Sequence, residues 1–350
     1  MGKIKVLLVE DSPTQRILEK KLLEGDPEIE IVGEAANGLE AVEKAEELKP
    51  DVILLDLQLP GIDGLEVIKR VMSKNPIPIL VLSSVVNKSE EFTSMEALKR
   101  GAVDVMEKPS IEKGQSWMQI AREIIKHVKE VSKVHVVPHV GAQGLEKIPE
   151  VEITEVPTHK YEAVAIGAST GGPKLINQIL MSLPEDYPMP IFIVQHIAPG
   201  FDEGFAEWLD KTVKMKVKLA ENGEMVKPSV AYVAPVGYHM KVNERREIQL
   251  DNGSPVNNQK PSADVLFESV AEVYSDRAIG IILSGMGRDG AEGLKKMKDR
   301  GGKVFVLRAE ECVVFGMPGA ALESGAVDRT SSLEEIIQFL LQAGKIAQVK

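Results

Sequence analysis

The stretch Asp51–Ile68, DVILLDLQLPGIDGLEVI, begins with an apolar run that ends at Asp56 and continues, after Pro60 and Gly61, into a helical pattern. A short run rich in Val, Ile and Leu predicts a strand buried on both faces, and the period that follows predicts an amphipathic helix. The same alternation recurs through residues 3–129. Its expected strands read KIKVLLV, EIEIVGEA, DVILLDL, PILVLSS and VDVME. Five such units predict a doubly wound, mostly parallel α/β sheet.

A second alternation of the same kind begins at Tyr161, with expected strands EAVAIG, PIFIVQ, VAYVAP, AIGIILSG and GKVFVL. Within it, residues 239–253, HMKVNERREIQLDNG, alternate in polarity and end in DNG, which predicts an inserted β-hairpin. Residues 130–158 contain Pro, Gly and Val without a sustained period and indicate a linker. The sequence therefore predicts two doubly wound α/β domains, residues 1–129 and 159–350, joined by that linker.

Composition restricts the class of protein. The 350 residues carry a formal net charge of -11, which argues against nucleic-acid binding because phosphate neutralisation needs clustered Lys and Arg. No apolar run reaches the length of a membrane span, and residues 1–13 do not form a signal peptide, so we expect a cytoplasmic protein without direct membrane insertion. The single cysteine, Cys312, excludes an intrachain disulfide and a multi-cysteine metal site.

Polar side chains follow the expected strands of the first domain. They are Glu10 and Asp11 after strand one, Asp56 at the end of strand three, Ser83 at the end of strand four and Lys108 after strand five. Ligands of parallel α/β sheets bind at the carboxyl ends of the strands, so these groups are expected to share one shallow pocket. Close carboxylates repel one another unless a cation such as Mg²⁺ binds them, and a phosphoryl group on one of them would be held by the metal, the hydroxyl and the lysine.

With Pro109 and the sequence DLQLPGIDGLEVI, these residues make the first third of the chain resemble the receiver domain of two-component response regulators. The resemblance implies a flavodoxin-like fold, phosphate transfer from a histidine kinase, Mg²⁺ binding and sensing of the phosphoryl group. The implied acceptor is Asp56, the implied Mg²⁺ ligands are Glu10, Asp11 and Asp56, and the implied sensors are Ser83 and Lys108. Receivers often carry an aromatic switch residue in the fifth strand, where this chain has Val105. That difference argues against aromatic rotation as the signal relay.

Ser169 lies in AVAIGASTGG, residues 163–172, between an expected strand and an expected helix that begins near Pro173. Considered by itself, Ser169 can be a helix cap, a nucleophile or part of a glycine-rich ligand loop. A dinucleotide-binding loop is disfavoured, because serine stands where the second glycine of G-x-G-x-x-G should be. A nucleotide-binding P-loop is disfavoured because no Walker lysine follows. A serine nucleophile needs a base, and the base needs an acid that fixes its tautomer.

Two histidines of the second domain follow strands, His196 after PIFIVQ and His239 after VAYVAPVGY. We favour His196 because its strand directly follows the strand of Ser169. Asp289 in ILSGMGRDG follows another strand, whereas solvation or capping accounts for Asp264. Ser169, His196 and Asp289 are therefore predicted to meet at the carboxyl edge of one sheet as a catalytic triad. In α/β-hydrolases the acid precedes the histidine, so this chain order argues against that fold.

The second domain resembles the catalytic domain of the chemotaxis protein-glutamate methylesterases, the CheB family. The matching stretches are IGASTGGP, QHIAPGF, AYVAPVGYHM, KPSADVLFESVA, ILSGMGRDGAEGL and ECVVFGMPGAA. The resemblance implies hydrolysis of glutamate methyl esters on methyl-accepting chemoreceptors with release of methanol, deamidation of receptor glutamines, and a chemotaxis histidine kinase as phosphodonor. It implies no cofactor for the esterase chemistry. Ser169, His196 and Asp289 match the family's triad, and Thr170 and Met286 fall where oxyanion support is placed.

The order of the two domains suggests how the receiver controls the catalytic domain, and it leaves two other functional classes for the second domain to be weighed. Under our regulatory hypothesis the unphosphorylated receiver covers the catalytic edge, and charge added at Asp56 shifts that docking equilibrium.

A DNA-binding effector would need a recognition helix on a basic face, but the segment after residue 158 has mixed charge and an α/β pattern. A nucleotide-binding module would need the phosphate loop that GASTGG does not provide.

Overall fold

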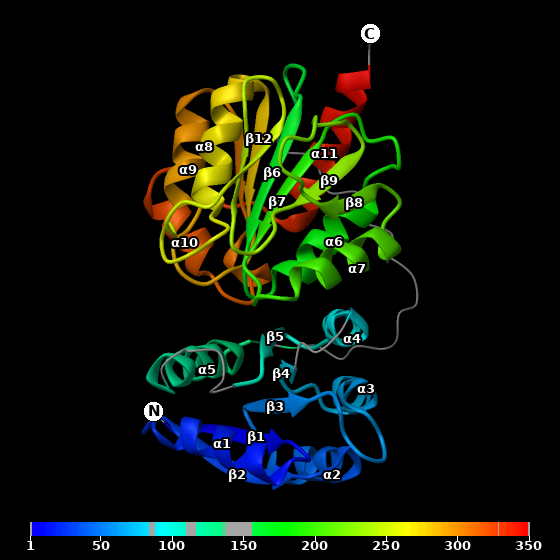
Figure 1. Ribbon diagram of the computed structural model, residues 1–350, viewed down its shortest axis with the longest axis vertical. Helices are drawn as coiled ribbons and strands as arrows, with labels where there is room; N and C mark the ends of the chain where they lie inside the picture. Colours follow the sequence, from blue (N-terminus) through cyan, green and yellow to red (C-terminus); the bar gives the residue numbers. More distant parts are fainter. Residues whose placement is uncertain are drawn as a thin grey trace. The chain divides into compact units, whose positions relative to one another are not determined.

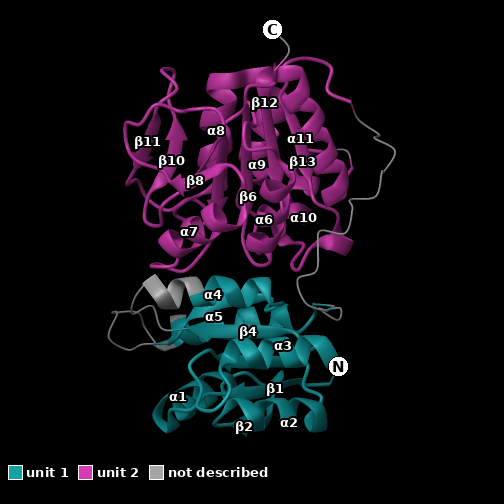
Figure 2. Cartoon of the chain, turned by 90° about the vertical axis from the view of Figure 1, so that its right-hand side faces the viewer, with its two compact units in different colours: residues 1–144 teal, residues 145–350 magenta. Residues whose placement is uncertain are grey.

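The computed structural model describes residues 2–83, 88–109, 117–134, 136, 156–327 and 329–348. The chain divides into two compact units, Met1–Gly144 and Leu145–Lys350 (Figure 2). Each unit contains a parallel sheet with helices on both faces, which confirms the predicted fold class (Figure 1). The predicted linker, residues 130–158, lies largely outside the described residues, so its limits stay a prediction.

Unit 1 is a five-stranded parallel sheet in the order β2-β1-β3-β4-β5. Its strands are β1 (Ile4–Val9), β2 (Ile29–Ala35), β3 (Val52–Asp56), β4 (Ile79–Ser83) and β5 (Asp104–Glu107). Its helices are α1 (Pro13–Glu24), α2 (Gly38–Leu48), α3 (Gly64–Lys74), α4 (Lys88–Lys99) and α5 (Trp117–Val131). Helices α1 and α5 lie on one face and α2, α3 and α4 on the other (Figure 1), so β3 is buried along its whole length.

Side-chain caps begin the first three helices of unit 1. Ser12, Asn37 and Asp63 each accept a hydrogen bond from the backbone amide three residues later, at 3.4, 3.0 and 2.8 Å. Such a cap satisfies one of the amides that have no partner in the first helical turn. Each cap follows the carboxyl end of a strand, so the chain turns there and leaves the residues between strand and helix at that edge of the sheet.

Unit 2 is built on a six-stranded sheet, all parallel, in the order β13-β12-β6-β7-β9-β8. The strands are β6 (Ala163–Ala168), β7 (Ile191–Gln195), β8 (Lys216–Leu219), β9 (Val230–Val233), β12 (Ala278–Ile282) and β13 (Lys303–Val306). The sequence predicted five of these and missed β8. Its sequence KVKL is short and alternates lysine with apolar residues, because β8 lies at the edge of the sheet and is buried on one side only.

Helices cover both faces of the unit 2 sheet. They are α6 (Gly172–Ser182), α7 (Asp202–Thr212), α8 (Ala263–Tyr274), α9 (Ala291–Asp299), α10 (Gly316–Glu323) and α11 (Leu333–Gln348), with short 3₁₀ helices at Ser275–Arg277 and Ala309–Glu311. Figure 1 shows α8 and α9 on one face and α6, α7 and α11 on the other. Within the described residues, no helix is long and apolar enough to cross a membrane.

The predicted hairpin is confirmed as β10 (His239–Val242) and β11 (Ile248–Asp251), which pair antiparallel and pack on α8. Its turn precedes DNG in the sequence. Asn243 donates its amide to Glu247 O at 3.0 Å, so the chain reverses at residues 243–247. Asp251 belongs to β11 and pairs with His239, and DNG therefore ends the hairpin instead of turning it.

Strand β6 lies at the point where the strand order of unit 2 reverses. The chain passes from β6 to β7 on one side and later returns to β12 on the other. Ala168 at the end of β6 pairs with Gln195 at the end of β7, and Gly167 pairs with Ile282 of β12. Because ligands of open α/β sheets bind at such a switch point, the loops that follow these three strands form the expected site.

Candidate active site and phosphoacceptor site

His196 and Asp289 form a buried pair at the carboxyl edge of the unit 2 sheet. His196 directly follows β7, and its amide donates to Ala168 O at 2.9 Å. Its ring Nε2 lies 2.9 Å from Asp289 Oδ2, and the two side chains are only 7% and 2% exposed. The ring Nδ1 is also buried and has no hydrogen-bond partner among the described residues. The pairing therefore leaves Nδ1 as the nitrogen that can accept a proton.

Asp289 is held by hydrogen-bond donors at the start of helix α8. These donors are Ser262 Oγ at 2.6 Å, Ala263 N at 2.7 Å and Asp264 N at 3.4 Å. Ser262 is the N-cap residue of α8 but does not cap the helix with its own side chain, so the Asp289 carboxylate replaces it. Burial would raise the pKa of Asp289, but its bond to His196, the charge of that ring and the donors lower the pKa overall. Asp289 is therefore ionised at neutral pH.

Ser169 lies beside this pair. Since Ala168 pairs with Gln195, the next residues in register are Ser169 and His196, and neighbouring parallel strands are about 4.8 Å apart. Ser169 N donates to Ser284 O at 3.0 Å, and Ser169 O accepts from Gly172 N at 2.8 Å. The helix-cap interpretation of Ser169 is wrong, because Gly171 is the N-cap residue of α6 and has a positive φ of 78°.

The predicted oxyanion residues lie in the two loops around Ser169. Thr170 is buried, and its Oγ1 has no hydrogen-bond partner within the described part of the chain, so this hydroxyl is free to donate. The carbonyl of Thr170 is fixed by Ser284 Oγ at 2.7 Å. Met286 lies in the loop after β12 and is partly exposed. The neighbouring Gly285 packs closely on Ser169, since a Cβ atom at Gly285 would lie 2.9 Å from Ser169 Cβ.

His239 contacts Ser262 and is not available as the base. Its Nδ1 accepts the amide of Ser262 at 3.2 Å, and its Nε2 lies 3.0 Å from Ser254 O. Both ring nitrogens are therefore occupied, and the residue is buried. His239 fixes Ser262, which in turn donates to Asp289.

For Asp264 we predicted solvation or capping, and capping is the alternative that fits, because its carboxylate lies at the first turn of α9. Solvation does not describe it, because Asp264 is buried and accepts hydrogen bonds from Gly293 N and Asn257 Nδ2, both at 2.6 Å. Burial, with the nearby charge of Asp289, raises the pKa of Asp264. The Asn257 amide also lies 3.3 Å from Asp289 Oδ1, so it links the two carboxylates. Sequence patterns did not single out Asn257, since it lies in a loop between the hairpin and α8.

Cys312 is the only cysteine and lies outside the site, half-buried, with its Sγ 3.8 Å from Leu307 O. Burial, with the negative charges of Glu311 and Glu310, raises the pKa of its thiol to about 12. The thiol is therefore protonated and a poor nucleophile at neutral pH.

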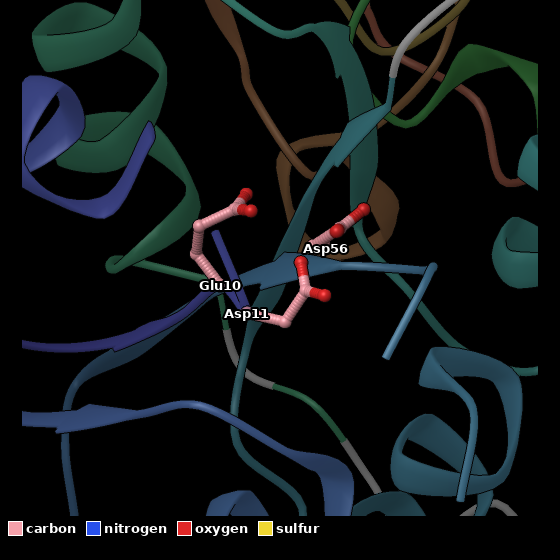
Figure 3. Close-up of side chains that lie close together, drawn as sticks. All are labelled: Glu10, Asp11 and Asp56. Atoms are coloured by element: carbon pink, nitrogen blue, oxygen red, sulfur yellow. The ribbon is translucent and has the colours of Figure 1, made fainter. Parts of the chain in front are cut away.

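The carboxyl edge of unit 1 brings together the predicted phosphoacceptor residues. Lys108 Nζ lies 2.8 Å from Glu10 Oε2 and 2.8 Å from Asp56 Oδ2. The amide of Lys108 donates to Ser83 O at 2.9 Å, which fixes the loop after β5 beside β4. Asp11 is exposed and completes a group of three carboxylates, in which one oxygen from each residue lies within 4.8 Å of the other two (Figure 3).

Lys108 offsets part of the negative charge at this edge. Burial raises the pKa of Glu10, although Lys108 opposes that rise. Burial would lower the pKa of Lys108, but its bonds to Asp56 and Glu10 raise the pKa overall, so the ammonium keeps its proton. Three hard oxygen ligands this close together fit Mg²⁺, which prefers carboxylates and completes its shell with water and phosphate oxygens.

Two further residues complete the account of unit 1. Ser83 is buried, and its hydroxyl accepts a hydrogen bond from Ser94 Oγ at 3.0 Å. Val105 is a buried residue of β5 that pairs with Val81 of β4. With the sequence DVME, this strand contains no aromatic side chain that could rotate.

Comparison with known proteins assigns a family to each unit. The CheB methylesterase family matches residues 164–340, and the response regulator receiver domain matches residues 6–116. The chain belongs to the CheB methylesterase family. The protein-glutamate methylesterase/protein-glutamine glutaminase 1 of Syntrophus aciditrophicus is 41% identical over 350 residues, covering 98% of this chain and 99% of the relative. The corresponding enzyme of Archaeoglobus fulgidus is 42% identical over 348 residues, covering 96% and 98%.

A solved structure supports the same family assignment for unit 2. The crystal structure of the Thermotoga maritima CheB methylesterase catalytic domain is similar to this chain with a TM-score of 0.50 and 39% sequence identity. The similarity covers 52% of this chain and 98% of that one. The family's hydrolase fold therefore extends over the sheet on which Ser169, His196 and Asp289 lie.

Proposed function

We propose that the chain hydrolyses glutamate methyl esters of chemoreceptors, releasing methanol, and deamidates selected receptor glutamines, with Ser169, His196 and Asp289 as the catalytic triad. The contact between His196 and Asp289 carries the proposal. A buried carboxylate that is bound to one ring nitrogen, while the other ring nitrogen is free beside a serine, is the arrangement that activates a hydroxyl nucleophile.

In the proposed reaction Ser169 Oγ attacks the ester carbonyl as His196 Nδ1 takes its proton. Asp289 stabilises the resulting imidazolium through Nε2. The carbon–oxygen bond to the methoxy group then breaks, and His196 returns the proton so that methanol leaves and the receptor glutamyl group stays on Ser169. Water, deprotonated by His196, attacks this acyl-enzyme and releases the carboxylate and the free Ser169 hydroxyl. A glutamine side chain follows the same course and releases ammonia.

The oxyanion of each tetrahedral intermediate needs hydrogen-bond donors. The unpaired Thr170 hydroxyl is one candidate donor, and Met286 follows Gly285, which packs on Ser169. Removing one oxyanion donor costs about 10²- to 10³-fold in kcat in serine hydrolases. We assign Thr170 and Met286 to this role on the family resemblance and on the free hydroxyl.

Unit 1 would control this chemistry through phosphorylation of Asp56 by a chemotaxis histidine kinase. Glu10, Asp11 and Asp56 would hold Mg²⁺, which supplies positive charge to the phosphoryl oxygens when it is bound. Lys108 and Ser83 lie at the same edge and would contact the phosphoryl group, which adds about -1.5 to -2 charge. We expect that added charge to increase the esterase activity of unit 2.

The test is methanol release from membranes that carry methylated chemoreceptors. Full-length protein is compared with His196→Gln, each with and without Mg²⁺ and a small-molecule phosphodonor. Loss of the general base predicts a fall in kcat of about 10²- to 10⁴-fold. A variant that keeps wild-type turnover would exclude His196 as the base and with it the proposed triad.

A further inference from the structure

Gln195 makes contacts with the backbone of both the serine and the histidine of the site. It is the last residue of β7 and the only polar residue in IFIVQ, and it is 3% exposed. Its side-chain Nε2 donates to Ser169 O at 2.9 Å and to His196 O at 2.8 Å. Both hydrogens of this amide are therefore used, one on each residue.

The surroundings of Gln195 fix the orientation of the amide. Turning it by 180° would place Oε1 against the two carbonyl oxygens, since only the NH₂ group can donate. In the observed orientation Oε1 is buried and has no partner among the described residues. A Cβ atom at Gly172 would overlap Oε1, so this position of α6 must lack a side chain. An unpaired buried acceptor destabilises the folded state, and the two bonds that the amide donates offset that cost.

The sheet does not need Gln195 to hold its strands together. His196 N already donates to Ala168 O at 2.9 Å and continues the ladder between β6 and β7. The two carbonyls that Gln195 binds lie beyond this ladder, where the chain leaves both strands. Gln195 therefore adds a connection between the two loops that carry the reacting side chains.

We propose that Gln195 is a positioning residue that sets the separation of Ser169 and His196 by holding both of their carbonyl groups. The proposal rests on the proposed esterase function. Gln195 contacts neither reacting side chain, so its effect is on geometry. A displacement of the nucleophile by about 1 Å can cost roughly 10²-fold in rate, even when the substrate still binds.

The experiment measures kcat and KM for methanol release by full-length wild type, Gln195→Met and Gln195→Glu, together with thermal unfolding. Met fills the same volume but donates no hydrogen bond. We expect Gln195→Met to lower kcat by about 10- to 100-fold while KM changes less than about twofold. Gln195→Glu is expected to be poorly active when ionised, because its carboxylate faces two carbonyls. On acidification the protonated carboxyl donates one bond, so the activity of this variant relative to wild type at the same pH rises.

Two results would overturn the inference: wild-type kcat in Gln195→Met, or the same pH-independent loss relative to wild type in both variants. The second result would indicate a packing role only. If Gln195→Met does not fold, the pH dependence of the activity of Gln195→Glu relative to wild type tests the proposal instead. Ser169→Ala, assayed in parallel, separates the two proposals. Should Ser169→Ala retain methanol release, the proposed function fails, whereas an inactive Ser169→Ala with a fully active Gln195→Met defeats only the positioning role.

Discussion

Asp289 Oδ2 lies 2.9 Å from His196 Nε2 and 2.7 Å from the backbone amide of Ala263, so one carboxylate oxygen serves the triad and the start of helix α8. The first turn of helix α8 therefore fixes the position of the Asp289 carboxylate. An asparagine oxygen at the Oδ2 position would still accept from Ala263 N, and its NH₂ group at the Oδ1 position can donate to the Ser262 hydroxyl. A neutral side chain therefore fits at this position, which makes the charge of Asp289 separable from its place in the fold.

Asp289→Asn is predicted to fold and to lose most of its esterase activity. The asparagine amide cannot stabilise a charged imidazolium, and it can select the wrong tautomer of His196. By analogy with other triads, kcat should fall by up to about 10⁴-fold. Methanol release and a thermal melt of the same preparation check this. A variant with kcat within threefold of wild type would show that Asp289 is not the acid of the triad.

The neutral ring of His196 is predicted to carry its proton on Nε2, because Nε2 faces the Asp289 carboxylate and Nδ1 is unpartnered. Multiple-bond ¹⁵N–¹H correlation spectra distinguish the two tautomers. His239 is an internal control, since its Nδ1 accepts the Ser262 amide and its proton must also be on Nε2. A proton on Nδ1 of His196 would leave no free acceptor for Ser169 and would contradict the proposed mechanism.

Gly285→Ala is predicted to damage catalysis by moving Ser169. The new methyl group would overlap Met317 Sδ, lie 2.9 Å from Ser169 Cβ, which is closer than real Cβ atoms come, and lie 3.0 Å from Ser169 N, which is tighter than most Cβ contacts. We expect kcat to fall at least about tenfold and unfolding to become easier by about 1–3 kcal/mol. Gly319→Ala in α10 is the matched control, because its nearest neighbour there is Phe315 Cδ1 at 3.3 Å. Equal kcat values for the two variants would refute the expected displacement.

Much of this architecture could be predicted from the sequence, and the exceptions have physical causes. Strands such as β3 and β7 are continuous apolar runs because both faces are covered, and parallel order brings their carboxyl ends to one edge, which predicted Ser169 beside His196. Strand β8 has no continuous apolar run, because it is a short strand at the edge of the sheet. Gln195 was missed because its role depends on which carbonyl groups the fold brings within reach of its amide.

Glu19 of α1 predicts a pH effect on the stability of unit 1. Burial, with the charge of Glu10, raises the pKa of Glu19 from 4.5 to about 8. A raised carboxyl pKa favours the folded state fully below pH 4.5, and this contribution is lost as the pH rises through about 8. Glu19→Gln should therefore match wild type near pH 4 and exceed its free energy of unfolding by up to roughly 3 kcal/mol near pH 7.

Denaturant unfolding of the full chain in the presence of a chelator measures this difference without interference from Mg²⁺. Glu66→Gln is the control, because Glu66 is only partly buried and its pKa is lowered by Arg70, so neutralising it should not stabilise the protein at neutral pH. No gain in stability of Glu19→Gln on going from pH 4 to pH 7 would mean that Glu19 is not buried as a neutral acid.

Asp56→Asn is predicted to remove the increase in methanol release that a phosphodonor and Mg²⁺ produce, since an amide cannot form the acyl phosphate. Lys108→Ala should weaken the same increase, because Lys108 Nζ contacts Asp56 at 2.8 Å. Both are assayed as the ratio of rates with and without phosphodonor. Stimulation that persists in Asp56→Asn would place the phosphoacceptor elsewhere.

The most direct measurement of the central claim is methanol release from methylated receptor membranes by Ser169→Ala, with Ser254→Ala as an exposed serine control. We predict that Ser169→Ala loses the activity in the presence and in the absence of phosphodonor, while Ser254→Ala keeps the wild-type rate. Normal methanol release by folded Ser169→Ala would contradict the assignment of Ser169 as the nucleophile and, with it, the proposed acyl-enzyme mechanism.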